Sequence, residues 1–324
     1  MRAFTFAAPA SVEAAVGGDA TTAFLAGGTT LVDLMKLEVL TPSRVLDINA
    51  LPLRGIETGR DGLRLGALER MSDIAAHPAV AERYPVIAQA LLASASQQIR
   101  NMASIGGNLM QRTRCGYYRD VTVPCNRREP GSGCPAAEGT NRPHAVLGTS
   151  DACVATHPSD VAVALVALDA TVRLRDAAGT RTVRLADFYR QPGTTPHVEN
   201  VLRPGELVTD VLVPALPWAR RSVYLKIRDR QSYEFALCSA AVALDVRGGR
   251  VAGARVAAGG VGTVPWRLPA VEAALRGRPA RQETYEAAAR QAVRGARPLT
   301  HNAFKTTLLR RTIVRALLSL EAGA

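Results

Sequence analysis

An apolar strand, a glycine pair and a helix follow one another near the N-terminus, where the chain reads Phe24-Leu25-Ala26-Gly27-Gly28-Thr29-Thr30-Leu31. Ala23 to Ala26 has the length of a short strand, and apolar residues recur at helical spacing from Thr30 to Leu40. Glycines let a ligand approach the backbone closely, and amides at the start of a helix favour phosphate oxygens. The stretch therefore predicts a strand–turn–helix unit with a candidate phosphate-binding turn. A plain tight turn is the alternative, because the pair matches neither the dinucleotide fingerprint nor the P-loop.

A second glycine pair repeats the small–Gly–Gly–polar pattern in Ala103-Ser104-Ile105-Gly106-Gly107-Asn108. Two such turns in one domain would hold the two phosphates of a dinucleotide from opposite sides. Further along, Ser159-Asp160 precedes a predicted buried helix that starts at Val161. Asp160 is suited to capping that helix, and its carboxylate is equally suited to binding sugar hydroxyls.

Working outward from these turns, the sequence predicts an α/β part followed by an α+β part. The first part alternates strands and helices, with expected strands at 2–6, 23–26, 44–48, 63–67, 170–175, 182–185 and 207–213. Its helices are expected from Ser11 and Ser72 as N-caps, from Thr30, and at 86–94 and 161–168. We place a domain boundary near residue 220, which gives domains 1–220 and 221–324. In the second, strands at 222–228, 235–246 and 251–258 precede helices at 282–294 and 302–320. Strands followed by helices predict an antiparallel sheet with helices on one face, and the fold class is α+β.

Four of the five cysteines lie in one irregular stretch, residues 111–153, spaced C-x9-C-x8-C-x18-C at Cys115, Cys125, Cys134 and Cys153. Cys238 sits in an apolar strand and is expected to be a core residue. Four thiols in one loop suit zinc, an iron–sulfur cluster, or two disulfides in an oxidising compartment. A metal or cluster is the interpretation we favour, although the spacing does not identify which.

Composition excludes several classes of protein. The chain has 324 residues, 47% of them apolar and 21% charged, as in a soluble globular protein. Its formal charge is +12, and only three of the 40 basic residues are lysines. The arginines are scattered and aromatic residues are few, so we expect an acidic cofactor or partner rather than nucleic acid. No apolar run approaches the roughly 18 residues of a membrane-spanning helix. No signal peptide or nucleophile–base pair is recognisable.

Taken in order, these motifs resemble those of the FAD-binding medium subunit of the xanthine dehydrogenase family of molybdenum hydroxylases. The resemblance runs nearly end to end and rests on Ala26-Gly27-Gly28-Thr29, Ser104 to Asn108, Ser159-Asp160, Gly205-Glu206-Leu207 and Tyr224-Leu225-Lys226. The four-cysteine insertion is similar to that of the branch with an extra [4Fe-4S] cluster, which includes aldehyde oxidoreductases and 4-hydroxybenzoyl-CoA reductases. The segments 111–115 and 226–230 are most similar to the aldehyde oxidoreductases.

The resemblance implies which residues hold the cofactors. Phe24, Leu25, Ala26, Gly27, Gly28, Thr29, Thr30 and Leu31 would wrap the FAD pyrophosphate, together with Ser104, Gly107 and Asn108. Asp160 would contact ribityl or ribose hydroxyls, and Val208, Lys226 and Ser94 would line the flavin or adenine region. Cys115, Cys125, Cys134 and Cys153 would bind the [4Fe-4S] cluster.

The resemblance also implies a division of labour among subunits, with no catalytic residue in this chain. A large subunit would oxidise an aldehyde at a molybdenum cofactor, and a small subunit would carry [2Fe-2S] clusters. Electrons would then pass through FAD in this chain to an external acceptor. A 4-hydroxybenzoyl-CoA reductase-like or xanthine dehydrogenase-like enzyme is the alternative. The chain is expected in the periplasm if it is exported together with the large subunit, and otherwise in the cytoplasm.

Overall fold

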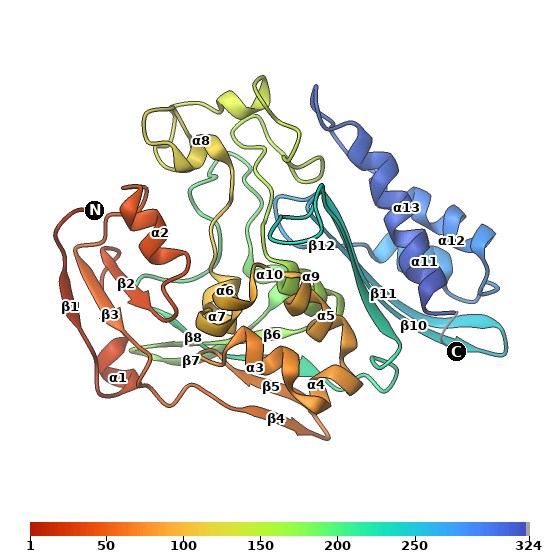
Figure 1. The fold of residues 1–324 in the computed structure, drawn as a ribbon, viewed down its shortest axis with the longest axis horizontal. Helices are drawn as coiled ribbons and strands as arrows, with labels where there is room; N and C mark the ends of the chain where they lie inside the picture. The colour runs from red at the N-terminus through yellow and green to blue at the C-terminus, as the bar shows by residue number, and fades with distance from the viewer. Residues whose placement is uncertain (322–324) are drawn as a thin grey trace.

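The fold was analysed in a computed structural model that describes residues 1–321 (Figure 1). The N-terminal unit is a three-stranded parallel sheet in the order β1 (Thr5–Ala7), β3 (Arg44–Asp47), β2 (Thr22–Leu25). Two short helices connect its strands, α1 (Val12–Ala15) and α2 (Leu31–Lys36). Ser11 caps α1 as expected, because its Oγ accepts a hydrogen bond from the Ala14 amide.

A five-stranded antiparallel sheet follows, in the order β4 (Ile56–Gly59), β5 (Gly62–Gly66), β8 (Leu207–Pro214), β6 (Thr171–Asp176), β7 (Gly179–Arg184). Strand β8 pairs with both β5 and β6, so distant parts of the chain meet at the centre of the sheet. The connecting helices are α3 (Met71–Ala76), α4 (Pro78–Arg83), α5 (Pro85–Ala93), α6 (Gln97–Met102), α7 (Ile105–Leu109), α9 (Asp160–Ala167) and α10 (Leu185–Phe188). Helix α9 is buried along its whole length in the largest core cluster.

The C-terminal part is a four-stranded antiparallel sheet in the order β12 (Trp266–Arg267), β11 (Arg250–Gly259), β10 (Cys238–Arg247), β9 (Ser222–Ile227). Helices α11 (Pro269–Leu275), α12 (Gln282–Ala289) and α13 (Phe304–Ser319) lie along one side of it, and η2 (Arg290–Val293) follows α12 (Figure 1). Helices α5 and α9 also pack on this sheet, which joins it to the rest of the molecule. The expected α+β class, with an antiparallel C-terminal sheet, is confirmed.

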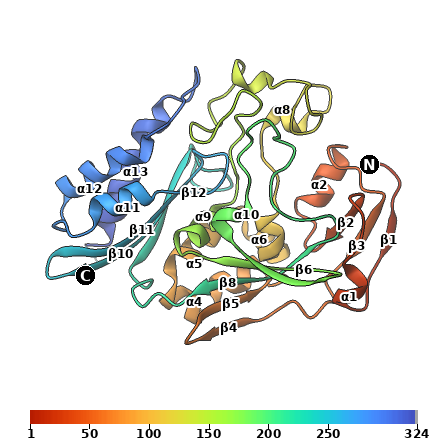
Figure 2. The same ribbon diagram turned by 180° about the vertical axis from the view of Figure 1, so that it is seen from behind.

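The cysteine-rich stretch contains little regular structure. Between residues 111 and 153 the chain forms only α8 (Gly116–Arg119) and the single turn η1 (Pro135–Ala137). Both views show this stretch at one end of the molecule, beyond α2 and the N-terminal end of α13 (Figures 1 and 2). No helix among residues 1–321 is both long and apolar enough to cross a membrane.

Three local expectations were wrong. Helix α3 begins after Arg70, so Ser72 lies inside its first turn and caps nothing. The second glycine pair lies inside α7, which Ser104 caps by accepting from the Gly107 amide, so it does not form a turn. Ser159 caps α9 through the Ala162 amide, and Asp160 is the first helical residue rather than the cap. Ser159 and Ser104 both have the extended backbone that a capping residue needs, so these two helices begin at a serine.

Candidate cofactor site

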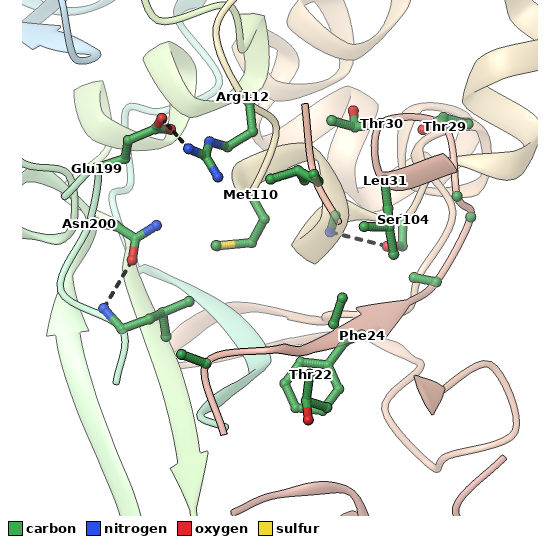
Figure 3. A pocket seen from close by; sticks show the side chains of 18 of the residues that line it. Thr22, Phe24, Thr29, Thr30, Leu31, Ser104, Met110, Arg112, Glu199 and Asn200 are labelled. Atoms are coloured by element: carbon green, nitrogen blue, oxygen red, sulfur yellow. Dashed lines mark hydrogen bonds and ion pairs between the residues drawn. The ribbon is translucent and has the colours of Figure 1, made fainter. Parts of the chain in front are cut away.

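A cavity of about 690 Å³ lies between the first glycine loop and the chain around residue 200 (Figure 3). Residues 26–31 form one wall, and Ser104, Gly107 and Met110 at α7 form another. Arg112 and the segment 197–200 complete it on the opposite side, with Glu199 and Asn200 facing the glycine loop. We call this space the first cavity.

The glycine loop presents a row of backbone amides that have no partner. Within residues 1–321, the N–H groups of Gly27, Gly28, Thr29, Thr30 and Leu31 donate no hydrogen bond. The carbonyls turn the other way, since Gly28 O accepts from Val32 N and Thr30 O from Leu34 N, each at 3.0 Å. Consecutive amides of this kind at the start of a helix are suited to binding an anion.

The two glycines of this loop are required for different reasons. A Cβ on Gly27 would lie 2.0 Å from the carbonyl oxygen of Met102, so the loop packs directly against the backbone that precedes α7. Gly28 has φ of +71°, a conformation that L side chains rarely adopt. The pair therefore shapes the loop and brings it against α7.

The sequence predicted that the amides at the start of α7 would bind phosphate, but these amides already donate hydrogen bonds within the protein. Ile105 N donates to Glu69 O, Gly106 N to Ala67 O and Gly107 N to Ser104 Oγ. What α7 offers instead is the hydroxyl hydrogen of Ser104 and the bare Cα of Gly107. A Cβ on Gly107 would meet only Ser104 Oγ, at 3.0 Å, so this edge of the helix is open to the cavity.

A second cavity of about 440 Å³ adjoins the first, since Thr29, Thr30 and Gly107 line both. Ser94, Asn108, Asp160 and Lys226 line it, together with residues 233–235. Asn108 Oδ1 accepts a hydrogen bond from Ser159 Oγ at 2.6 Å, which joins the C-terminal end of α7 to the start of α9. The two cavities form an extended site on both sides of the glycine loop.

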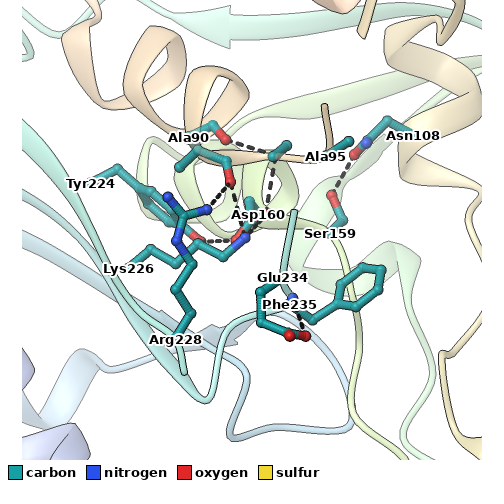
Figure 4. A network of polar contacts seen from close by, with 12 residues as sticks. Ala90, Ala95, Asn108, Ser159, Asp160, Tyr224, Lys226, Arg228, Glu234 and Phe235 are labelled. Carbon is teal, nitrogen blue, oxygen red and sulfur yellow. Dashed lines mark hydrogen bonds and ion pairs between the residues drawn. The ribbon is translucent and has the colours of Figure 1, made fainter. Parts of the chain in front are cut away.

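Asp160 is the centre of a buried polar network at the floor of the second cavity (Figure 4). Its carboxylate accepts from Tyr224 Oη at 2.6 Å, from Lys226 Nζ at 2.8 Å and from Ser94 Oγ at 3.1 Å. Lys226 also donates to Ala93 O at 3.0 Å. Burial and the neighbouring Asp160 charge raise the pKa of Tyr224 well above its ordinary value, so its hydroxyl keeps its proton.

This network gives Asp160 a structural role in addition to the expected one. The Ser94 hydroxyl also lies 2.7 Å from Ala90 O, so at least one acceptor site of the carboxylate remains for a ligand hydroxyl. Asp160 holds Lys226 and Tyr224 in place at the cavity floor, whereas the ammonium of Lys226 has one hydrogen still free.

Two predicted residues are not brought to either cavity. Val208 on β8 is 6% exposed and belongs to the main core cluster, where it packs between the sheet and its helices. Leu25 ends β2 and lines neither cavity, although its neighbours Phe24 and Ala26 line the first. The strand pleat explains Leu25, because alternate side chains point to opposite faces.

The four cysteines of the irregular stretch converge. Cys115, Cys125, Cys134 and Cys153 line one small cavity, together with Tyr118 and Arg127. All are free thiols, and Cys238 lies apart in the C-terminal core cluster, as expected. Within residues 1–321, no three His, Cys, Asp or Glu side chains are close enough together to hold a single metal ion. The thiols therefore surround a space instead of meeting at a point.

Several donors are directed at these sulfurs. Arg127 Nη2 and the Ala155 amide each lie 3.5 Å from Cys153 Sγ, and His144 Nε2 lies 3.2 Å from Cys115 Sγ. Burial raises the pKa of Cys115 to about 11 in the protein alone, although the amides of Tyr118 and Tyr117 oppose this rise. Without a cationic occupant, the Cys115 thiol keeps its proton at neutral pH.

Charged residues that carry no sequence motif complete the site. Asp33 in α2 forms ion pairs with Arg119 at 2.8 Å and Arg114 at 3.3 Å, both from the cysteine-rich stretch. Glu199 forms ion pairs with Arg112 at 2.8 Å and Arg127 at 3.0 Å. Sequence reasoning missed Asp33, Arg112 and Glu199, because only the tertiary fold brings them to the site.

Two family models together match nearly the whole chain. The family model described as "FAD binding domain in molybdopterin dehydrogenase" matches residues 2–216, and that described as "CO dehydrogenase flavoprotein C-terminal domain" matches residues 223–320. The chain belongs to the FAD-binding medium subunits of the molybdenum hydroxylases. The FAD-binding family model covers the glycine loop and α7, so the extended site is a candidate flavin site.

The chain is similar to two curated subunits and to a chain of one solved enzyme. It is 49% identical over 304 residues to the aldehyde oxidoreductase FAD-binding subunit PaoB of Escherichia coli, covering 93% of this chain and 92% of that one. It is 32% identical over 256 residues to the glyceraldehyde dehydrogenase medium chain of Sulfolobus acidocaldarius, covering 79% and 73%. The solved carbon monoxide dehydrogenase from Hydrogenophaga pseudoflava superposes with a TM-score of 0.75 at 27% identity, over 99% of this chain and 98% of that chain. The two family models and the Escherichia coli subunit are named for FAD or for a flavoprotein, and none of these names mentions an iron–sulfur cluster.

Proposed function

We propose that this chain is the electron-transfer subunit of a molybdenum-dependent aldehyde oxidoreductase, carrying FAD and a [4Fe-4S] cluster. Two relatives favour an aldehyde substrate. The relatives at 49% and 32% identity are both named for aldehydes, whereas carbon monoxide dehydrogenase and nicotine 6-hydroxylase medium subunits are 28% and 27% identical. The aldehyde would be oxidised to a carboxylic acid on the large subunit.

The row of partnerless amides at residues 27–31 is the observation that carries the flavin assignment. The residues that carry these five N–H groups line the first cavity, and Thr29 and Thr30 also line the second, as a cofactor with a central pyrophosphate requires. The Ser104 hydroxyl would supply one further donor, and the bare edge of Gly107 would let the phosphates approach. These chemical features and the two adjoining volumes fit FAD.

The second cavity would hold the end of FAD that Lys226 can reach. FAD supplies the redox chemistry, and the protein binds it and adjusts its electronic properties. Asp160 and the Ala93 carbonyl orient the Lys226 ammonium, leaving one N–H to donate to a carbonyl or phosphate oxygen of the cofactor. Tyr224 remains protonated and fixes the carboxylate from the other side, so the floor of the site is positioned before FAD binds.

Cys115, Cys125, Cys134 and Cys153 would hold the [4Fe-4S] cluster. Four thiols lining one space is the donor set that such a cluster takes. Zinc bound by the same four thiols is the alternative, and iron and acid-labile sulfide analysis distinguishes the two. The Arg127 side chain and the Ala155 amide, both near Cys153, would offset the negative charge of cluster-bound thiolates.

Partners and location complete the proposal. Named relatives are medium subunits, which supports a heterotrimer with a large molybdenum-cofactor subunit and a small [2Fe-2S] subunit. Electrons would enter FAD from the [2Fe-2S] clusters and leave to an external acceptor. The chain would be periplasmic if a signal on the large subunit exports the assembled complex, and cytoplasmic otherwise. Cell fractionation with and without the N-terminal segment of the large subunit distinguishes the two.

The experiment is anaerobic reduction of the co-purified complex by an aldehyde. Adding an aromatic or aliphatic aldehyde should bleach the flavin absorption near the visible maximum, and xanthine should not. An aromatic acyl-CoA would accept electrons from a reductase of the alternative type, so it should fail to reoxidise the flavin after dithionite has reduced it. The matched control is complex lacking the molybdenum cofactor, in which dithionite but no aldehyde bleaches the flavin. Bleaching by xanthine alone would replace the aldehyde assignment with the xanthine dehydrogenase-like one.

A further inference from the structure

Four charged or aromatic side chains connect the cysteine cavity to the first cavity. Arg127 donates to Cys153 Sγ at 3.5 Å, and its Nη1 lies 3.0 Å from Glu199 Oε1. The same Oε1 lies 2.8 Å from Nη2 of Arg112, which lines the first cavity. Arg112 also lies over the ring of Tyr118, 5.5 Å from its centroid, and Tyr118 lines the cysteine cavity.

Burial makes Glu199 essential to this arrangement. The side chain of Arg127 is 9% exposed and that of Glu199 is 14% exposed, so solvent screens their attraction only weakly. Removing the carboxylate would leave two guanidinium groups close together without a counter-charge, and they would reorient. Asp33 also binds two arginines of the cysteine-rich stretch, but it is 38% exposed, and within residues 1–321 neither of these arginines donates a hydrogen bond to a sulfur. Glu199 is therefore the stronger link.

We infer that Glu199 couples the two cofactor sites by holding Arg127 against the cysteines and Arg112 against the first cavity. This inference rests on the proposed function, since it assumes a cluster at the cysteines and FAD at the glycine loop. Glu199, Arg112 and Arg127 act as positioning residues. Ordering of the cysteine-rich stretch by a cluster places Arg112 at the flavin site, so FAD binds more tightly when the cluster is present. By thermodynamic linkage, bound FAD must strengthen cluster binding by the same factor.

The test is a cycle of FAD dissociation constants, measured by flavin fluorescence on the full chain. Cluster-loaded protein is compared with the cluster-free form produced by Cys134→Ser, in the native background and with Glu199→Gln. We expect loss of the cluster to weaken FAD binding about tenfold, within the usual range of such couplings. With Glu199→Gln the two constants should become equal.

The matched control is Glu206→Gln, which removes another buried carboxylate from the same region. Glu206 pairs with Arg181 at 2.6 Å and is fully buried, but neither residue lines a cofactor cavity described above. The Glu206→Gln variant should keep the tenfold ratio between the FAD dissociation constants of the cluster-free and cluster-loaded forms. If Glu199→Gln prevents folding, Arg127→Lys serves instead, because lysine keeps the charge and lacks the fork needed to bridge Glu199 and Cys153.

A redox potential provides a second readout that a merely structural role would not change. Arg127→Gln should make the cluster potential more negative, because it removes a positive donor from an anionic centre, and Arg127→Lys should restore part of the shift. An unchanged ratio with Glu199→Gln, or equal loss with Glu206→Gln, overturns the coupling while leaving the proposed function intact. Absence of iron from the native protein overturns both.

Discussion

At Gly107 an added side chain would change the shape of the candidate cofactor site and leave the packing of the fold almost unchanged. Its neighbours Gly27 and Gly106 are packed against backbone or Ala67, whereas a Cβ on Gly107 would meet only the Ser104 hydroxyl and would point into the shared edge of the two cavities. The glycine inside α7 costs helix stability, by about 1 kcal/mol relative to alanine. Such a costly residue is consistent with close approach of a ligand.

Gly107→Ala should therefore weaken FAD binding at least tenfold without lowering the melting temperature of the FAD-free chain. Titration of FAD-free protein with FAD, alongside a thermal melt, measures both effects. Gly59→Ala is the control, since a Cβ there meets nothing within 4 Å. Unchanged FAD affinity in Gly107→Ala would show that the phosphates lie elsewhere.

His157 makes the stability of the chain sensitive to acid. Burial, reinforced by the nearby Arg127 charge, lowers the pKa of this histidine to about 3, below its unfolded value near 6.5. The unfolded chain therefore binds a proton that the folded chain does not between these values, and folding stability falls as the pH drops below about 6.5.

By pH 4 this single group should cost about 3 kcal/mol of unfolding free energy. Urea unfolding of the full chain at several pH values measures the slope. His157→Gln should reduce that slope by about one proton. An identical slope in the variant would mean that His157 titrates normally in the folded state.

At the scale of elements, strands were predicted more reliably than short helices. Alternating or continuous apolar runs located β2, β5, β6, β8, β9 and β11 to within a few residues. Helices α4, α6 and α10 have only four to six residues, too few for a helical period to be recognised. The central position of β8 was not predictable, because it depends on pairing between residues 62–66 and 210–214.

The candidate site follows the same division. Local chemistry identified the glycine loop, the second glycine pair with Ser104, and the four cysteines, since each has a recognisable residue type in a short motif. Lys226 was expected only from the family resemblance. Glu199 and Asp33 are ordinary surface-type residues in the sequence, and only the fold brings their arginine partners to them. The bonds that Tyr224 and Lys226 donate to Asp160 were not predictable, because both residues reach it from a distant strand.

The cysteine-rich stretch is the element whose order should depend most on its occupant. It has little regular structure, so its conformational entropy must be offset by tethers and by a bound cluster. Cys134→Ser should remove most of the iron and make residues 111–153 susceptible to limited proteolysis. Cys238→Ser should leave iron unchanged, because Cys238 is fully buried in the other core cluster. Iron analysis of both variants tests this assignment. Equal iron loss in the two variants would show that these four cysteines do not bind a cluster together.

At the scale of the whole molecule, the first cavity and the cysteine-lined cavity lie on separate parts of one chain and are joined by charged contacts. The glycine loop belongs to the N-terminal sheet, Lys226 to the C-terminal sheet, and the cysteines to the stretch that lies beyond both (Figures 1 and 2).

The most direct test is the cofactor content of the anaerobically purified native chain, measured together by visible absorption and by iron and acid-labile sulfide analysis. The account predicts one FAD and about four iron atoms per chain, as one [4Fe-4S] cluster requires. Protein that is folded but contains neither flavin nor iron, and takes up neither on reconstitution, would contradict it.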